Sequence, residues 1–163
     1  VATIHQTLVH GVRQPGDDAT RMSQMPAFGR DGILTPAQVQ DVVSHVRVIS
    51  GQEGPSGSSQ RGAEIFAANC VACHGTNGEG GRAFGAPKLD DAIWLYGGDR
   101  KALTQTVTNA RYGVMPSWGA RLDPVTVKML ATYVHSLGGG EEAPAPAADP
   151  AAPDPAAAPA AAK

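Results

Sequence analysis

The sequence predicts a mostly α-helical fold, made of one complete small domain and the second half of another of the same kind. The first observation is helical periodicity: Val127, Leu130, Val134 and Leu137 are spaced by three and four residues and form one apolar face. The second is a helix-start signal just before them, Asp123 followed by proline. The third is an internal repeat that relates the two ends of the chain.

The complete domain is expected at residues 58–140, where the sequence contains the signals for three helices and a long glycine-rich loop. The predicted limits are Ser59 to Val71 for the first helix, residues 75–89 for the loop, Asp99 to Gly113 for the second helix, and Asp123 to the glycines at 138–140 for the third.

Two breaker-rich segments separate the predicted units. Residues 52–57 combine glycine, proline and serine and are predicted to be a linker. Residues 141–163 are almost entirely alanine and proline with a few acids, a composition that cannot bury a core, and we expect a disordered tail there.

Residues 1–51 repeat the second half of the complete domain. The run Met-Pro-Ala-Phe-Gly at 25–29 corresponds to Met-Pro-Ser-Trp-Gly at 115–119, and Leu-Thr-Pro at 34–36 corresponds to Leu-Asp-Pro at 122–124. Upstream, Gln6-Thr7 corresponds to Gln105-Thr106. The first half of this copy would have to precede Val1, so we expect the chain to be a fragment cut within a first domain.

Composition limits the function. The net charge is −2, which argues against a nucleic-acid partner, because such proteins usually need a basic face. Aromatic residues make up only 5%, with Gly 20 and Pro 13, so a small loop-rich domain is short of core and needs a staple. The two cysteines, Cys70 and Cys73, are too close together for a useful structural disulfide. A bound cofactor is the better candidate.

Cys70, Cys73 and His74 form the attachment signature of c-type haem, Cys-x-x-Cys-His. The two thiols add to the two vinyl groups of the porphyrin, and the adjacent imidazole lies under the ring and binds iron. The two-residue spacing places both sulfurs on one side of a helix end. Haem attachment is therefore the chemistry that this motif predicts.

A sixth iron ligand is predicted at Met115. A soft thioether suits electron transfer and raises the reduction potential, and Met115 is far enough along the chain to reach the opposite face of the ring. Pro116 fixes φ and stiffens the loop. Met25 is the matching ligand of the incomplete domain, and a packing role is the alternative for either methionine.

The carbonyl of Pro87 is expected to accept the ring N–H of His74, which would fix the tautomer and raise the basicity of the ligand. An ordinary turn is the alternative there. A thioredoxin-type pair needs a βαβ context that this sequence lacks, and a zinc site needs a second Cys or His pair at short spacing.

Taken together, these residues resemble class I cytochrome c, and more closely the dihaem subunit III of cbb3-type cytochrome c oxidases. The closer resemblance rests on four runs of sequence. They are Ser-Gln-Met-Pro-Ala-Phe-Gly at 23–29, Gly-Ala-Pro-Lys-Leu at 85–89 with Ala-Ile-Trp-Leu-Tyr-Gly at 92–97, Gly-Val-Met-Pro-Ser-Trp-Gly-Ala-Arg-Leu at 113–122, and the helix at 127–140.

This resemblance implies a class I cytochrome c fold and a haem c electron-transfer subunit. Electrons would pass from a donor cytochrome c or the bc1 complex to the oxygen-reducing catalytic subunit of a proton-pumping oxidase. It also implies other oxidase subunits as partners and a location at the periplasmic face of the bacterial inner membrane, held by an N-terminal anchor that this chain lacks. One covalent haem c is expected here and a second in the full-length protein. The chain itself would not catalyse a reaction.

Three alternatives remain open at this point. A soluble or dehydrogenase-linked dihaem electron carrier would lack the anchor helix. A haem enzyme or gas sensor would have an open iron position and would bind carbon monoxide. A zinc or thiol-redox module would bind no haem.

Overall fold

The computed structural model describes residues 1–138. The regular secondary structure in that range is helical. The only extended pairings there are isolated bridges, such as the one between Val12 and Met115. The prediction of a mostly helical fold is confirmed, while the expected tail at 141–163 lies outside the described residues. The helices are α1 (Ala2–His10), α2 (Pro36–Ile49), α3 (Gly57–Asn69), α4 (Val71–His74), α5 (Arg100–Asn109) and α6 (Pro124–Gly138).

Local side-chain caps fix where the helices begin. Thr35 and Gln38 form a capping box at the start of α2, and Ser56 and Ser59 form another at the start of α3. Asp99 accepts from the backbone N–H of Ala102 at 3.0 Å, which confirms the predicted cap of α5. Each cap satisfies backbone donors that have no partner within the helix.

Three predicted helix limits differ from the structure. The first helix begins at Gly57, because Ser56 is its cap, and it breaks at Cys70 instead of continuing through Val71. The second helix ends at Asn109, before the predicted Gly113. It ends there because Ala110 adopts φ 53°, in the left-handed region, which turns the chain out of the helix.

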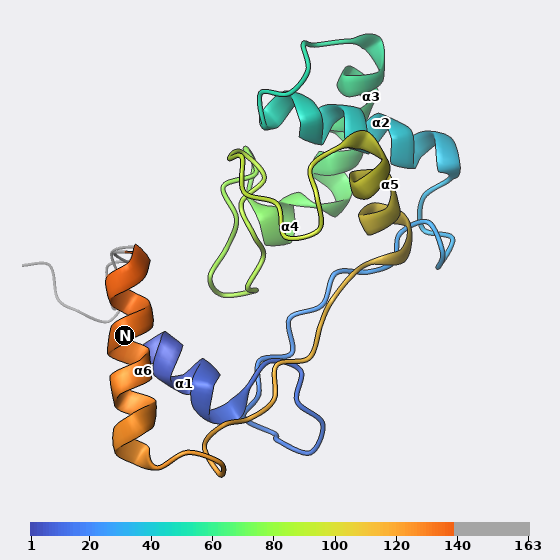
Figure 1. Cartoon of the computed structure of the whole chain (residues 1–163). Helices are drawn as coiled ribbons and strands as arrows, with labels where there is room; N and C mark the ends of the chain where they lie inside the picture. Colours follow the sequence, from blue (N-terminus) through green and yellow to red (C-terminus); the bar gives the residue numbers. More distant parts are fainter. Residues whose placement is uncertain (139–163) are drawn as a thin grey trace, which may run out of the picture.

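The main core lies where α2 packs against α3 and α5 (Figure 1). Val42 and Val43 of α2 and Phe66 of α3 are almost completely buried in it. At the crossing of α2 and α3, a Cβ on Gly62 would lie 2.0 Å from the carbonyl oxygen of Asp41. The two backbones can approach this closely only because position 62 has no side chain.

The second group of helices consists of α1 and α6, which lie against each other at the far end of the molecule (Figure 1). Val127 and Ala131 of α6 are buried. The two groups are joined by two chain segments that run side by side, and the backbones of Val12 and Met115 exchange two hydrogen bonds of 3.0 Å there.

The repeats therefore exchange their second halves in this structure. Helix α2, from the first repeat, covers α3 and α5 of the second repeat, whereas α6 lies on α1. The domain boundaries at 1–51 and 58–140 remain a prediction drawn from the sequence repeat, and the packing mixes helices from both ranges.

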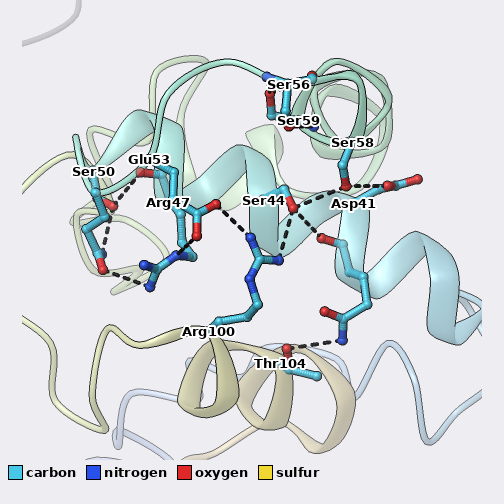
Figure 2. A network of polar contacts seen from close by, with 12 residues as sticks. Asp41, Ser44, Arg47, Ser50, Glu53, Ser56, Ser58, Ser59, Arg100 and Thr104 are labelled. Atoms are coloured by element: carbon cyan, nitrogen blue, oxygen red, sulfur yellow. Dashed lines mark hydrogen bonds and ion pairs between the residues drawn. The ribbon is translucent and has the colours of Figure 1, made fainter.

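A polar network ties α2 to its neighbours (Figure 2). Asp41 accepts two hydrogen bonds from the guanidinium of Arg61, at 2.9 and 2.8 Å, and one from the hydroxyl of Ser58 at 2.6 Å. The hydrogen bonds from Arg61, then that from Ser58, lower the pKa of Asp41. Glu53 forms ion pairs of 2.6 Å with both Arg47 and Arg100. The network links α2 and the turn after it to α3 and α5.

Gly62→Ala is expected to lower the free energy of unfolding by about 1–3 kcal/mol, because the added methyl overlaps the α2 backbone. Gly57→Ala in the same helix is the matched control, since its Cβ would meet only an Arg61 nitrogen at 3.8 Å. The control should change stability by less than about 1 kcal/mol in urea titrations followed by circular dichroism. Equal effects at both positions would contradict the close crossing.

Acid is expected to weaken the link between α2 and α3. Because the pKa of Asp41 is lower in the folded state than its ordinary value of 3.8, its contribution is complete above that value. The contribution is lost as the pH falls through the folded-state pKa. Asp41→Asn should therefore flatten the decline of stability below about pH 4, measured by denaturation across a pH series. Arg61→Met should have the same effect, and an unchanged acid limb in both variants would contradict this role.

Candidate haem-attachment site

The Cys-x-x-Cys-His motif lies at the junction of α3 and α4. Cys70 ends α3, and its carbonyl accepts the backbone N–H groups of Cys73 at 3.2 Å and His74 at 2.9 Å. One tight turn therefore holds both sulfurs and the imidazole. Both thiols are free, with Cys70 half-buried and Cys73 exposed.

The environment of Cys70 does not favour a thiolate. Burial, with a smaller contribution from the nearby Cys73, raises the pKa of Cys70 to about 11. Reactive or metal-binding thiols usually have a lowered pKa, so this environment does not favour a thiol-redox role. Residues 1–138 also contain no cluster of three or more Cys, His, Asp or Glu that could hold a metal ion such as zinc.

His74 is held by the loop that follows it. Its Nδ1 lies 3.0 Å from the carbonyl oxygen of Pro87, the contact expected from the sequence. Because a carbonyl can only accept, Nδ1 carries the proton and Nε2 of the neutral ring keeps its lone pair. Burial lowers the pKa of His74, an effect that the Pro87 hydrogen bond opposes. The neutral form, which is the form that can bind iron, is thereby favoured.

Backbone contacts within the glycine-rich loop position Pro87. Gly81 and Ala86 exchange two hydrogen bonds of 3.0 Å, and the N–H of Gly80 donates to the His74 carbonyl at 2.7 Å. Gly80 has φ +79°, and a Cβ there would lie 3.1 Å from the carbonyl carbon of Pro87. Sequence reasoning did not single out Gly80, although the glycine-rich character of the loop was the available signal.

Large apolar side chains are exposed in the chain that follows His74. In the segment after Pro87, Ile93 is 81% exposed and Leu95 is 86% exposed, and Phe84 in the loop is also exposed. Burying such side chains is favourable, so they would be stabilised by a large apolar group against them. Two thiols and an imidazole whose Nε2 keeps its lone pair are a donor set that fits a haem, and the exposed apolar side chains offer surface for a porphyrin to cover.

The structure places the two candidate methionines differently. Met25 is half-buried and packs against the main core cluster, as do Cys70 and Val71. Met115 lies in the paired segments between the two helix groups, where its backbone is bonded to Val12. Next to Met25 in sequence, Ser23 donates a hydrogen bond to the carbonyl of Phe84, in the glycine-rich loop. The structure thus brings together Cys70, Cys73, His74 and Pro87, and it places Met25 rather than Met115 on their side of the molecule.

Comparison with known proteins shows what the chain is similar to. Residues 57–134 match the model of "Cytochrome C oxidase, cbb3-type, subunit III". The chain is similar to subunit III of cbb3-type cytochrome c oxidases. It is 55% identical to the subunit CcoP of Cereibacter sphaeroides, over 86% of this chain and 49% of that protein.

Other relatives show the same similarity. The chain is 55% identical to the subunit FixP of Bradyrhizobium sp. strain ORS 278, over 85% of this chain and 48% of that protein. The identity to the subunit CcoP of Azospirillum sp. strain B510 is 46%, over 86% and 50%. The chain therefore spans about half the length of the curated relatives that it matches.

These findings confirm the resemblance inferred from the sequence and the cytochrome c fold class. A cytochrome c-type family implies haem c as the cofactor. Among residues 1–138, none of the helices has the length and apolar character that a membrane crossing needs.

Gly80→Ala is expected to displace the Pro87 carbonyl from His74, because the added methyl meets the backbone of residues 86–88. Gly16→Ala is the matched control, since Gly16 has nearly the same φ, +80°, but no atom within 4 Å of the added Cβ. Both variants carry the cost of a left-handed alanine, of roughly 1 kcal/mol, but only Gly80→Ala should speed solvent exchange of the His74 ring N–H in NMR spectra. Unchanged exchange in Gly80→Ala would show that the loop does not hold the ring.

Proposed function

We propose that this chain is a haem c electron-transfer subunit of a cbb3-type terminal oxidase. The observation that carries the proposal is the single turn that presents Cys70, Cys73 and His74, with the imidazole oriented by Pro87. The match of residues 57–134 to the subunit III family supports the same conclusion.

Each residue of the site has a separate task. The thiols of Cys70 and Cys73 would anchor the porphyrin covalently, so the cofactor cannot dissociate. His74 would bind iron through Nε2, while the bond from its Nδ1–H to Pro87 keeps the ring in one orientation and one tautomer. When bound, haem c supplies a reversible one-electron couple whose potential depends on the axial ligands.

A methionine thioether would complete the iron coordination. Sequence spacing favours Met115, and the packing against the core cluster favours Met25. With an imidazole and a thioether both on iron, no position remains for a substrate or for a gas. The chain would therefore carry electrons without catalysing a reaction, and oxygen reduction would belong to another subunit.

The remaining parts of the proposal concern the assembly. Relatives named as oxidase subunits favour a complex with other oxidase subunits over a soluble or dehydrogenase-linked carrier. A donor cytochrome c or the bc1 complex would supply the electrons. We place the chain at the periplasmic face of the bacterial inner membrane, because haem is attached to such motifs outside the cytoplasm. A second haem c is proposed for the full-length protein.

The chain, expressed in a periplasm with haem-maturation machinery, is expected to contain one covalent low-spin haem. His74→Ala should give a high-spin spectrum or no haem, and Cys70→Ser with Cys73→Ser should abolish covalent attachment. His135→Ala, a histidine of α6 outside the site, is the control and should leave the spectrum unchanged. The measurements are the haem-per-chain ratio and the oxidised and reduced absorption spectra.

Two results would count against the proposal. A high-spin spectrum with ready carbon monoxide binding in the unmodified chain would indicate an open iron position, as in a haem enzyme or gas sensor. Absence of covalent haem after maturation would remove the basis for the proposed function.

A further inference from the structure

The turn that follows His74 has a carboxylate at its centre. The N–H of Gly80 donates to the carbonyl of His74 at 2.7 Å, which closes a ring around residues 75–79. The side chain of Glu79 folds back into this ring. A Cβ on Gly75 would lie 2.3 Å from the carboxyl carbon of Glu79 and 2.6 Å from each of its oxygens. The carboxylate therefore lies directly over the residue that follows His74.

Backbone N–H groups of the turn hold this carboxylate. Glu79 Oε2 accepts the N–H of Asn77 at 2.8 Å. The hydrogen bond from the N–H of Glu79 itself, followed by that from Asn77, lowers the pKa of the Glu79 carboxyl. Successive backbone N–H groups that point into one concavity form a site for an anion. In this turn the anion is a side chain of the turn itself.

The turn has little other support. In the described part of the chain, the N–H groups of Thr76, Asn77 and Glu79 donate to no backbone carbonyl. The backbone bond inside the ring, from Gly78 to Gly75, is 3.3 Å long, which exceeds the ordinary range of about 2.7–3.2 Å. Without the carboxylate, these N–H groups would have only water as an acceptor. The charge-assisted bonds to Glu79 are thus the main contacts inside the turn.

The same turn supports the segment that carries Pro87. The N–H of Leu89 donates to the carbonyl of Gly78 at 2.7 Å, and the paired bonds of Ala86 hold the chain just before Pro87. The proline is therefore held on both sides. Its carbonyl lies 3.0 Å from Nδ1 of His74. A change in the turn that moves the Gly78 carbonyl would consequently move the hydrogen-bond partner of the imidazole.

We propose that Glu79 is a positioning residue for the haem ligand His74, because its carboxylate holds the turn in the conformation that keeps the Pro87 carbonyl on Nδ1. Glu79 acts through the backbone of the turn, and in the described part of the chain it makes no hydrogen bond with the imidazole. This inference rests on the proposed function, since His74 is a ligand only when haem is bound.

Loss of the carboxylate is expected to have two linked effects. The bond from Nδ1–H to a carbonyl makes Nε2 of His74 a better donor to iron, which favours the oxidised state and lowers the reduction potential. When Glu79 no longer holds the turn, the ring N–H should exchange faster with solvent. The reduction potential should become more positive at the same time.

A negative charge close to a haem would also lower the reduction potential, without any effect on the turn. Two conservative variants separate this explanation from positioning. Glu79→Gln removes the charge, keeps the length of the side chain and leaves one oxygen that can accept. Glu79→Asp keeps the charge but shortens the side chain by one methylene, which withdraws the carboxylate from the N–H of Asn77. Positioning requires Glu79→Asp to resemble Glu79→Ala, whereas an effect of charge alone requires it to resemble the unmodified chain.

The test compares the haem-loaded forms of the unmodified chain, Glu79→Ala, Glu79→Gln, Glu79→Asp and the control Glu64→Gln. Glu64 is an exposed acid on α3, so its substitution removes the same charge outside the turn. NMR spectra of the reduced chain measure exchange of the His74 ring N–H, and redox titration measures the potential.

The Ala and Asp variants of Glu79 should speed exchange of the ring N–H by at least about tenfold and should raise the potential. Glu79→Gln should lie between them and the unmodified chain in its exchange rate. Glu64→Gln should leave the exchange rate unchanged. Should Glu79→Ala fail to fold, as judged by circular dichroism, the Asp and Gln variants decide between positioning and charge without it.

Two results would overturn the role of Glu79 while the haem is retained. The first is a normal exchange rate and potential in Glu79→Asp together with a raised potential in Glu79→Gln, because the carboxylate would then act by its charge alone. The second is the same exchange rate in all variants of Glu79 as in Glu64→Gln. Absence of covalent haem from the unmodified chain is a different result, and it would overturn the proposed function together with this inference.

Discussion

The close crossing of α2 and α3 at Gly62 is the contact on which the main core and the Cys70–His74 turn depend. The carbonyl of Asp41 occupies the space that a side chain at 62 would need, so the two helices share one layer of buried valines and Phe66. Helix α5 then completes the core on the other side of α2. A displacement at this crossing would move the end of α3, and with it Cys70.

The crossing fixes the position of α3, and the end of α3 carries the first residue of the site. Helix α3 ends at Cys70, and the following turn places the second thiol and the imidazole within a few residues. The glycine-rich loop returns to this turn through the hydrogen bond from Gly80 to His74, and the pairing of Gly81 with Ala86 inside the loop holds Pro87 where its carbonyl meets the His74 ring. The positions that carry chemistry thus depend on a rigid helix end and one loop that folds back onto it.

Much of this arrangement could be predicted from local sequence. The caps at Asp99 and Asp123 and the contact between Pro87 and His74 are short-range features, and each was correctly expected. The partner of α2 could not be predicted in this way. The two repeats carry the same apolar pattern, so periodicity cannot tell which helix covers α3. Asp41 and Arg61, which join α2 to α3, look like ordinary surface charges in the sequence. The early end of α5 was also missed, because a left-handed alanine has no sequence signal.

The neighbouring order of α2 and α3 along the chain has a consequence for folding during synthesis. Only residues 50–56 separate the two helices, so their contact closes a short loop and forms at low entropic cost. A ribosome releases both helices before α6 exists, and early contacts between adjacent elements form first. The order of synthesis therefore favours the contact between α2 and α3, because both helices are synthesised before α6.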